Sequence, residues 1–511
     1  MADFARALGS VPTGVDARLV DIQVALPRSG ETGQFRIVGM GDGALKEGRE
    51  RIRGALMHDG YPWPDGAVTV NLTPASARKE GPGLDLPIAL ALLAASGSLA
   101  GADPLGKTLC VGELTLDGRV RPVRGVLAAV EAARRAKVTE AIVPARNADE
   151  ASAVEGVVVR PVERLSEAVG HLRGALRLAP VPPLAWSPDD GGDAAWREVR
   201  GQPVAVRAAV VAAAGGHNLL LVGPPGAGKT LLARALQGLL PPLSREEALE
   251  VSRVQSAAGL LDGGLARARP FRAPHHTTSL AGLLGGGPIP RPGEVSLAHL
   301  GVLFLDELAE VPRPALEGLR QPVEDGAVVI GRAAGRAQFP SEVVLVGAMN
   351  PCPCGWLGSG VKACRCPGGL AARYRGRVSG PLLDRFDLRV TVRAVDPKAL
   401  LGPEATAASA VADPRPSIAI ARAAQRERAA RLGLPRTANA RIPAAALRVA
   451  VAADDAATDC LLRAARAYAL SGRGVHRTLR VARTIADLAG ADRVTETHVA
   501  EALQYRGEDP G

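Results

Sequence analysis

The chain has 511 residues, more than a single hydrophobic core supports, so two or three domains are expected. Hydrophobic residues make up 47% of it, which excludes a disordered chain despite 59 Gly and 40 Pro residues. The formal net charge of +10 permits a polyanionic partner without requiring one.

The first part of the chain predicts an α+β domain. Alternating hydrophobicity indicates strands at residues 18–26, 34–40 and 67–72, and helices are expected at about 43–58 and 86–96. The segment 86–102 is nearly uncharged but is short for a bilayer span, so a buried helix is expected. Residues 1–10 contain Asp3 and no apolar run, which predicts no secretory signal, no membrane contact and a cytoplasmic location.

The second part of the chain predicts a parallel sheet followed by helices. Residues 178–193 are rich in Pro, Gly and Asp and form a predicted linker. Short apolar runs at 218–222, 302–305 and 343–347 are typical of buried parallel strands. From about residue 394, Ala, Arg and Leu predict a helical lid. The expected division is therefore 1–177 for the N-terminal domain, 178–193 for the linker, 194–393 for the core and 394–511 for the lid.

A phosphate-binding loop is predicted at residues 223–230, where GPPGAGKT fits GxxxxGK[ST] between an apolar strand and a helix start. Glycines let backbone N–H groups face a β-phosphate, Lys229 reaches the β- and γ-phosphates, and Thr230 holds Mg²⁺. This context makes a chance glycine turn a poor explanation. The expected ATP-binding residues are Gly223, Pro224, Pro225, Gly226, Ala227, Gly228, Lys229, Thr230 and Asp306.

Two carboxylates follow the apolar run at 302–305. Asp306 is expected to bind Mg²⁺ through water, and Glu307 to orient and polarise the attacking water. Asn350 ends the next apolar run and is a candidate contact of the γ-phosphate and this water. An Asn at a strand end is also a common turn former.

Two arginines complete the candidate catalytic set. Arg385 lies between Asp384 and Asp387, where it either pairs with one of them or acts as an arginine finger on a neighbouring subunit's γ-phosphate. Arg477 starts a helically spaced basic series and either returns to the nucleotide or belongs to an exposed basic face. Residues 415–483 hold 14 Arg and 4 acidic residues, which fits a solvated helical surface or one that faces nucleic acid.

Four cysteines within fifteen positions indicate a metal site. Two CxC pairs across a Gly-rich loop can surround one tetrahedral, structural Zn²⁺, with reduced thiols or a redox pair as the alternatives. The expected ligands are Cys352, Cys354, Cys364 and Cys366. Cys110 and Cys460 are expected in the core.

Two inserted stretches, 269–294 and 327–340, are rich in Arg, His and Gly and are interpreted as loops that reach into a central pore. Arg332 and Arg336 are candidate contacts of nucleic-acid phosphates. His275 and His276 are adjacent and no acidic or Cys partner is near them in the sequence, so they do not predict a metal site.

The runs RPFRAPHHTTSLAGLLGGG, PGEVSLAHLGVLFLDEL, LRQPVEDG and MNPCPCG resemble the magnesium-chelatase-like AAA+ ATPases of the YifB or ComM family, and the resemblance covers essentially the whole chain. It implies a homo-oligomeric, hexameric ring that uses ATP and Mg²⁺. ComM-type members are similar to helicases that drive DNA branch migration during recombination of incoming DNA.

The N-terminal part also resembles the Lon-protease-like (ribosomal S5-like) domain. The run RKEGPG at residues 78–83 occupies the stretch that carries the nucleophilic serine in Lon, and Gly83 stands at that position. Leu127 stands where the dyad lysine is expected. Without a hydroxyl nucleophile or a lysine base, no peptide hydrolysis is expected, and the domain is assigned a structural or binding role.

Three functions remain open at this point. The first is a ring ATPase that remodels branched or single-stranded DNA. The second is a chelatase-type motor subunit for metal insertion, although such subunits lack the Lon-like domain and the cysteine cluster. The third is a nucleotide-switched scaffold whose protein partners are unknown. Glu307 argues against it, because this residue indicates turnover of ATP.

Overall fold

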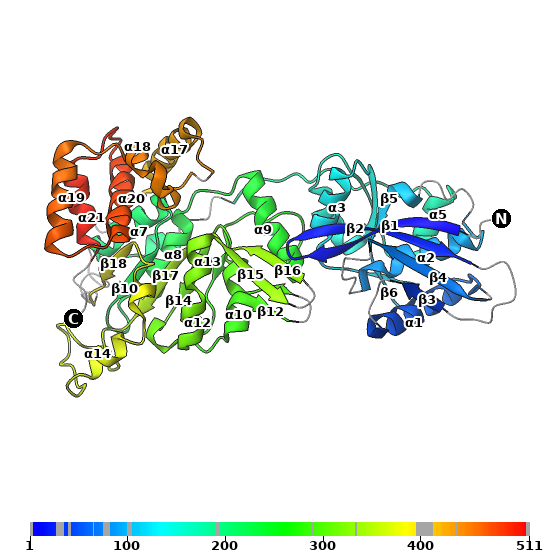
Figure 1. Cartoon of the computed structure of the whole chain (residues 1–511), viewed down its shortest axis with the longest axis horizontal. Helices are drawn as coiled ribbons and strands as arrows, with labels where there is room; N and C mark the ends of the chain where they lie inside the picture. The colour runs from blue at the N-terminus through cyan, green and yellow to red at the C-terminus, as the bar shows by residue number, and fades with distance from the viewer. Residues whose placement is uncertain are drawn as a thin grey trace.

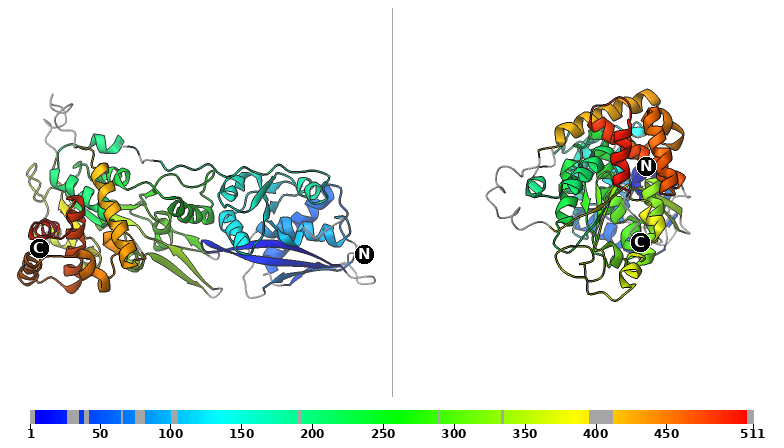
Figure 2. Two further views of the ribbon diagram at one scale, coloured as in Figure 1. Left: turned by 90° about the horizontal axis from the view of Figure 1, so that it is seen from above. Right: turned by 90° about the vertical axis from the view of Figure 1, so that its left-hand side faces the viewer.

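The computed structural model describes residues 4–26, 35–38, 42–64, 66–74, 82–99, 105–189, 192, 194–287, 290–332, 335–394, 412–435 and 437–506, with the backbone alone described at 42–46, 194, 332, 335 and 336. These residues form an elongated molecule (Figures 1 and 2). The N-terminal part occupies one end, the C-terminal helices occupy the other, and a sheet-containing core lies between them.

The N-terminal part is built on a mixed seven-stranded sheet with the order β3-β4-β2-β1-β5-β8-β9. The longest pair is antiparallel, with Phe4 opposite Ala25 and Thr13 opposite Asp16. The strands are β1 (Phe4–Thr13), β2 (Asp16–Ala25), β3 (Phe35–Val38), β4 (Val68–Thr73), β5 (Thr108–Cys110), β8 (Glu140–Pro144) and β9 (Val158–Val162), with a small hairpin of β6 (Glu113–Leu114) and β7 (Val120–Arg121).

Helices cover this sheet, and the apolar helix α2 belongs to the hydrophobic core of the N-terminal part. Every residue of α2 (Asp85–Ala95) is buried, as its uncharged sequence predicts. Its single carboxylate, Asp85, accepts a 2.6 Å bond from Arg51 Nε, because a buried charge needs a partner. Burial raises the pKa of Asp85 to about 6, against the opposing effect of Arg51. The other helices are α1 (Asp42–His58), α3 (Val126–Arg135), α4 (Ala148–Ser152) and α5 (Leu165–Leu172).

The central part is a five-stranded sheet with the order β11-β14-β17-β10-β18, in which every pair is parallel. The three apolar runs of the sequence form its middle, and Val302–Leu305 and Val344–Met349 are buried throughout. The strands are β10 (Leu219–Val222), β11 (Phe271–Arg272), β14 (Val302–Leu305), β17 (Val344–Met349) and β18 (Leu388–Thr391).

Helices and two hairpins surround this parallel sheet. The helices are α6 (Ala194–Glu198), α7 (Pro203–Gly215), α8 (Lys229–Leu239), α9 (Arg245–Ala258), α10 (Leu280–Leu284), α11 (Glu294–Leu297), α12 (Arg313–Gly318), α13 (Arg320–Asp325), α14 (Leu370–Arg375) and α15 (Gly380–Leu383). The hairpins are β12 (Gly285–Gly286) with β13 (Arg291–Pro292), and β15 (Ala327–Arg332) with β16 (Gly335–Pro340). The second hairpin spans the predicted inserted stretch 327–340.

The C-terminal part is helical within residues 412–435 and 437–506, as expected of a lid. Its helices are α17 (Arg415–Leu432), α18 (Leu447–Val451), α19 (Asp455–Ala467), α20 (Gly472–Leu488) and α21 (Glu496–Gln504). Their apolar faces share one hydrophobic cluster with α7 and with strands β10 and β18. The lid therefore rests on the sheet of the core.

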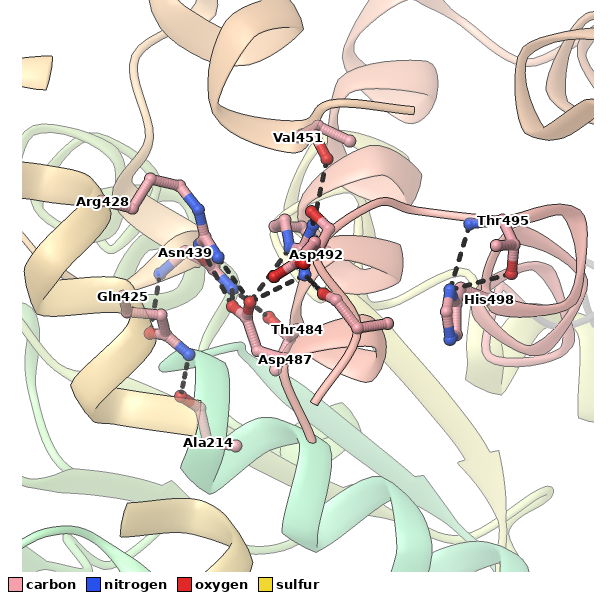
Figure 3. A network of polar contacts seen from close by, with 12 residues as sticks. Ala214, Gln425, Arg428, Asn439, Val451, Thr484, Asp487, Asp492, Thr495 and His498 are labelled. Carbon is pink, nitrogen blue, oxygen red and sulfur yellow. Dashed lines mark hydrogen bonds and ion pairs between the residues drawn. The ribbon is translucent and has the colours of Figure 1, made fainter. Parts of the chain in front are cut away.

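A buried polar network fixes the lid internally (Figure 3). Asp487 is 3% exposed. It accepts bonds from Arg428 Nη1 at 3.1 Å, from Arg483 Nε at 3.0 Å and from Asn439 Nδ2 at 2.8 Å. Arg428 and Arg483 of the basic stretch thus pair inside the lid. The number of arginines in the sequence therefore overstates the positive charge of the lid surface.

The N-terminal part contacts helix α9 of the core through α3 and α4. Arg253 Nε lies 2.6 Å from Glu131 Oε2, and Ser256 Oγ donates a 2.6 Å bond to Glu150. The β1–β2 turn lies against β16, where a Cβ added to Gly14 would come within 3.0 Å of the Gln338 carbonyl oxygen. Among the helices of the described residues, none combines the length and the apolar composition that a membrane span requires.

Replacing Asp487 by Ala tests the lid network. Arg428 and Arg483 would lose their shared counter-charge in a buried site, so we expect the free energy of unfolding to fall by about 3–5 kcal/mol. Urea denaturation measures it. The matched control is Glu496→Ala, which breaks the 2.9 Å ion pair between Glu496 and Arg463. The side chains of this pair are 51% and 68% exposed, respectively. That change should cost less than about 1 kcal/mol. Equal midpoints for the two variants would contradict the assignment.

Candidate functional site

A buried lysine organises the loop between β10 and α8. Lys229 Nζ donates to the carbonyl oxygens of Gly223 at 2.7 Å and Pro224 at 2.9 Å, and to Asn350 Oδ1 at 3.2 Å. Burial lowers the pKa of Lys229, and the charge of Asp306 opposes this shift. Gly228 has a φ of 82°, which a side chain rarely adopts, so the loop turns into α8 at a glycine. The amino end of α8 therefore faces the loop.

Two carboxylates lie at the same edge of the sheet, directly after β14. Asp306 Oδ2 accepts a 3.2 Å bond from Thr230 Oγ1. A hydroxyl beside a carboxylate is the oxygen donor set that Mg²⁺ prefers, so these two residues fit a magnesium ion. Glu307 adopts a φ of 49°, and its Oε2 lies 3.1 Å from His276 Nδ1. Asn350 follows β17 beside them.

The structure thus brings together most of the predicted nucleotide site. Residues 223–230, Asp306, Glu307 and Asn350 all follow the carboxyl ends of β10, β14 and β17, where parallel sheets bind ligands.

Arg385 and Arg477 lie elsewhere, in a cavity of about 440 Å³ at the opposite edge of the sheet. Asp387, which lines this cavity, comes directly before β18 and accepts a 3.1 Å bond from the backbone N–H of Asn218, directly before β10. The cavity is therefore at the amino ends of these strands. Its other charged residues are Glu324, Arg441, Arg473 and Arg480.

The ion pairs of this cavity differ from those the sequence suggested. Arg385 Nη2 contacts Glu324 of α13 rather than a neighbouring aspartate. Arg477 Nε lies 3.7 Å from Asp387 Oδ1, so Arg477 does not reach the phosphate loop of its own chain. Sequence spacing cannot foresee this position, because it depends on how α20 packs on the core.

The arginines in the cavity are short of counter-charge. Arg385 is 7% exposed, and its buried Nε has no hydrogen-bond partner among the described residues. Burial lowers the pKa of Arg385; Glu324 opposes this shift, while Arg477 and Arg473 add to it. An anion entering the cavity would therefore be stabilised by several guanidinium groups.

The four cysteines Cys352, Cys354, Cys364 and Cys366 form one cluster whose sulfur atoms all lie within 4.8 Å of one another. The Cys352 Sγ lies 3.4 Å from Cys354 Sγ and 3.7 Å from Cys364 Sγ. Tetrahedral Zn–S bonds of 2.3 Å imply sulfur separations of about 3.8 Å, so this donor set fits zinc. Cys110 is buried as expected, and Cys460 is half-buried against the lid core.

The cysteine loop packs directly on the phosphate loop. Gly355 has a φ of 81°, and a Cβ added there would lie 2.5 Å from Cδ of Pro225. The loop also begins directly after Asn350, so it is joined to the predicted nucleotide site both by the chain and by the contact with Pro225.

The predicted DNA contacts lie on the β15–β16 hairpin. Backbone pairing sets Gly331 opposite Arg336 and Arg332 opposite Gly335, while the side chains of Arg332 and Arg336 lie outside the described residues. The two hairpins are neighbours, since a Cβ on Gly285 would come within 3.2 Å of Ile330 Cδ1.

The structure describes both positions at which the protease dyad would stand. Gly83 lies in a short 3₁₀ turn, Pro82–Leu84, and Leu127 is fully buried in α3. Residues 78–81 of the same run lie outside the described residues.

His276 contacts this site, although no acidic or Cys partner stands near it in the sequence. The parallel pairing of β11 with β14 brings Glu307, 31 positions later, into contact with it. Both residues follow strands of the same sheet, and this shared position is the feature of the sequence that points to their contact.

Comparison with known proteins agrees with this geometry. Three family models match the chain: "Magnesium chelatase, subunit ChlI" at residues 195–400, "Subunit ChlI of Mg-chelatase" at 23–147, and "Magnesium chelatase, subunit ChlI C-terminal" at 408–506.

Several relatives match nearly end to end. An uncharacterized protein of Mycobacterium tuberculosis is 44% identical, with 98% of each chain covered. Competence protein ComM of Haemophilus influenzae is 41% identical, covering 96% of this chain and 95% of ComM. Uncharacterized protein YifB of Escherichia coli is 39% identical, covering 97% and 96%. A Lon protease of Aquifex aeolicus is 39% identical over 83 residues, 16% of this chain and 10% of that protein.

Replacing Gly355 by Ala tests the contact between the cysteine loop and the phosphate loop. The added methyl group would force one loop to move, so we expect the Kd for ATP to rise about tenfold, or about 1.4 kcal/mol. Titration with a fluorescent ATP analogue measures it. Gly360→Ala is the matched control, because Gly360 has a φ of 70° and its added Cβ would meet no atom of the described residues within 4 Å. Equal affinities of the two variants would show that the contact does not support nucleotide binding.

Proposed function

Because the chain belongs to the YifB/ComM family of magnesium-chelatase-like AAA+ ATPases, we propose that it is an ATP-hydrolysing ring motor that acts on DNA. The observation that carries the proposal is the division of the catalytic residues between two edges of one parallel sheet. Each chain then offers half of a hydrolysis site at each edge, and a second copy is needed to join the halves.

The carboxyl edge binds the nucleotide in this proposal. Backbone N–H groups of residues 223–228 surround the phosphates, and Lys229 leaves its carbonyl partners to reach the β- and γ-phosphates. Thr230 and Asp306 hold Mg²⁺, which, when bound, neutralises charge that develops on the phosphates. Glu307 accepts the proton of the attacking water, and Asn350 orients this water and the γ-phosphate.

The amino edge serves the neighbouring subunit. The four residues of β10 span roughly 13 Å, which separates Arg385 and Arg477 from the phosphate loop of their own chain. In the proposal both arginines reach the γ-phosphate bound by the next copy. Arg385 then leaves its ion pair with Glu324 and contacts this phosphate instead. Repeating this head-to-tail contact closes a ring, for which six subunits are proposed from the family resemblance.

DNA is the proposed substrate, with branch migration or helicase action in recombination or transformation as the proposed activity. The similarity to Competence protein ComM of Haemophilus influenzae supports this choice. The adjacent hairpins β12–β13 and β15–β16 are the proposed contact surface, with Arg332 and Arg336 binding backbone phosphates. A cytoplasmic location is part of the proposal. The chelatase-type motor and the scaffold are less well supported, since the chain matches ComM and YifB nearly end to end.

A structural Zn²⁺ is proposed in the cluster of Cys352, Cys354, Cys364 and Cys366. Four sulfur ligands leave no open position, so the ion would brace the loop beside Pro225 and take no part in hydrolysis. Elemental analysis that finds no zinc in the active protein would remove this proposal.

ATP hydrolysis with and without forked or single-stranded DNA tests the proposed function. We expect DNA to raise kcat several-fold and to bind in a salt-sensitive manner, because phosphate contacts release counterions. Glu307→Gln should still bind ATP and assemble while losing at least about 100-fold in turnover, because the attacking water loses its base.

The absence of both stimulation and salt-sensitive binding would contradict the DNA assignment. Persistent turnover in Glu307→Gln would contradict the role of Glu307 independently of DNA.

A further inference from the structure

Strands β1 and β2 project beyond the sheet to which they belong. Strand β1 pairs with β5 at Leu8, and β2 pairs with β4 at residues 21–25. Within the described part of the chain, residues 9–13 and 16–20 pair in the sheet with each other alone. Five strand residues rise roughly 17 Å, so residues 9–20 form an arm of about this length. The arm points at the β15–β16 hairpin of the core (Figures 1 and 2).

The tip of the arm packs on strand β16. Gly14 has a φ of 68°, and a Cβ added there would lie 3.0 Å from the carbonyl oxygen of Gln338 and 3.6 Å from its backbone nitrogen. Val15 is half-buried and packs against the hydrophobic cluster that contains Ala337 and Phe339 of the same strand. The turn of the arm therefore requires glycine twice, for its backbone conformation and for the close approach of β16.

The base of the arm is fixed to the core. One hydrophobic cluster contains residues of β5, α3 and β8 together with residues of α9, and Ala17 and Leu19 of the arm pack against it. The backbone N–H of Gly125, directly before α3, donates a 3.2 Å bond to the carbonyl oxygen of Ser256 in α9. A Cβ on Gly125 would also lie 3.4 Å from Cβ of Pro12 in the arm. The arm and α9 thus belong to one packed unit, so the tip has a fixed position relative to the core.

The arm meets the hairpin between its buried base and its tip. Phe339 is fully buried in the core, whereas the pairing of Arg332 with Gly335 is the last of the hairpin. Gln338, against which Gly14 lies, is two positions from Arg336, a proposed phosphate contact. The position of β16 at Gln338 therefore sets where the backbone of residues 335 and 336 lies.

We propose that the arm is a seat that sets the resting position of the β15–β16 hairpin, and that Gly14 and Val15 are its positioning residues. The inference rests on the proposed contact between this hairpin and DNA. It gives the N-terminal part a role in the motor that needs no protease dyad. A hairpin that is already held in place loses less conformational entropy when it binds the polymer, so the seat favours DNA binding.

Hydrogen exchange of the full chain, without DNA, tests the seat. Gly14→Ala would push a methyl group against the Gln338 carbonyl oxygen, so the amides of residues 327–340 should exchange at least about tenfold faster than in the wild type. Gly60→Ala is the matched control. Gly60 has a φ of 79°, and its added Cβ would meet no atom of the described residues within 4 Å. This variant carries similar backbone strain in the same part of the chain and should leave the exchange of residues 327–340 unchanged.

A second pair of variants avoids backbone strain. Val15→Ala removes two methyl groups from the contact with the hairpin and should also speed the exchange of residues 327–340. Val15→Ile keeps the apolar contact and should match the wild type.

The affinity for single-stranded DNA, measured by fluorescence anisotropy, is the second readout. The Kd for DNA should rise about fivefold in Gly14→Ala and stay at the wild-type value in Gly60→Ala and Val15→Ile, because these two variants leave the hairpin seated.

Unchanged exchange of residues 327–340 in both Gly14→Ala and Val15→Ala would overturn the inference, as would equal effects of Gly14→Ala and Gly60→Ala. Should Gly14→Ala fail to fold, faster exchange in Val15→Ala than in Val15→Ile would support the seat, and equal exchange would overturn it. A wild-type Kd for DNA in a variant whose hairpin exchanges faster would overturn the link between the seat and DNA binding. A wild-type protein that does not bind DNA would contradict the proposed substrate and leave the exchange comparison intact.

Discussion

All four strand pairs of the core sheet are parallel, so each strand delivers its carboxyl end to one edge and its amino end to the other. Lys229, Asp306, Glu307 and Asn350 collect at the first edge because each follows a strand. Arg385 precedes β18 and is therefore confined to the second edge. One chain thus carries both halves of the proposed catalytic site and cannot join them by itself.

The lid is tied to the arginine edge by buried polar contacts. His217, which is fully buried, lies 2.8 Å from Thr484 of the lid network and 3.5 Å from Asp387 of the arginine cavity. Burial acts to raise the pKa of Asp387, but His217 and Arg477 outweigh it and hold the pKa below its ordinary value. A charged Asp387 then orients Arg477. Movement of the lid and placement of the arginines are therefore coupled.

The sequence predicts the parts of the site that lie on contiguous segments. The strand, glycine turn and helix around Lys229 follow from local pattern, as do the carboxylates after β14, and the structure brings these residues together. Contacts between distant segments were not predictable in this way. The partner of Arg385 proved to be Glu324, 61 positions away, and the partner of Glu307 proved to be His276. Both depend on packing that a single sequence does not encode locally.

The shared site is tested most directly by mixing two inactive variants, Lys229→Ala and Arg385→Ala. In an equal mixture, one interface in four unites an intact phosphate loop with an intact arginine, so ATP hydrolysis should return to about a quarter of the wild-type rate. Mixing Lys229→Ala with Glu307→Gln is the control. Lys229 and Glu307 lie at the same edge of the sheet, so no subunit in this mixture carries both residues, and the mixture should be no more active than the separate variants. Full activity of Arg385→Ala alone, or a Lys229→Ala and Arg385→Ala mixture as inactive as its components, would contradict a site built between subunits.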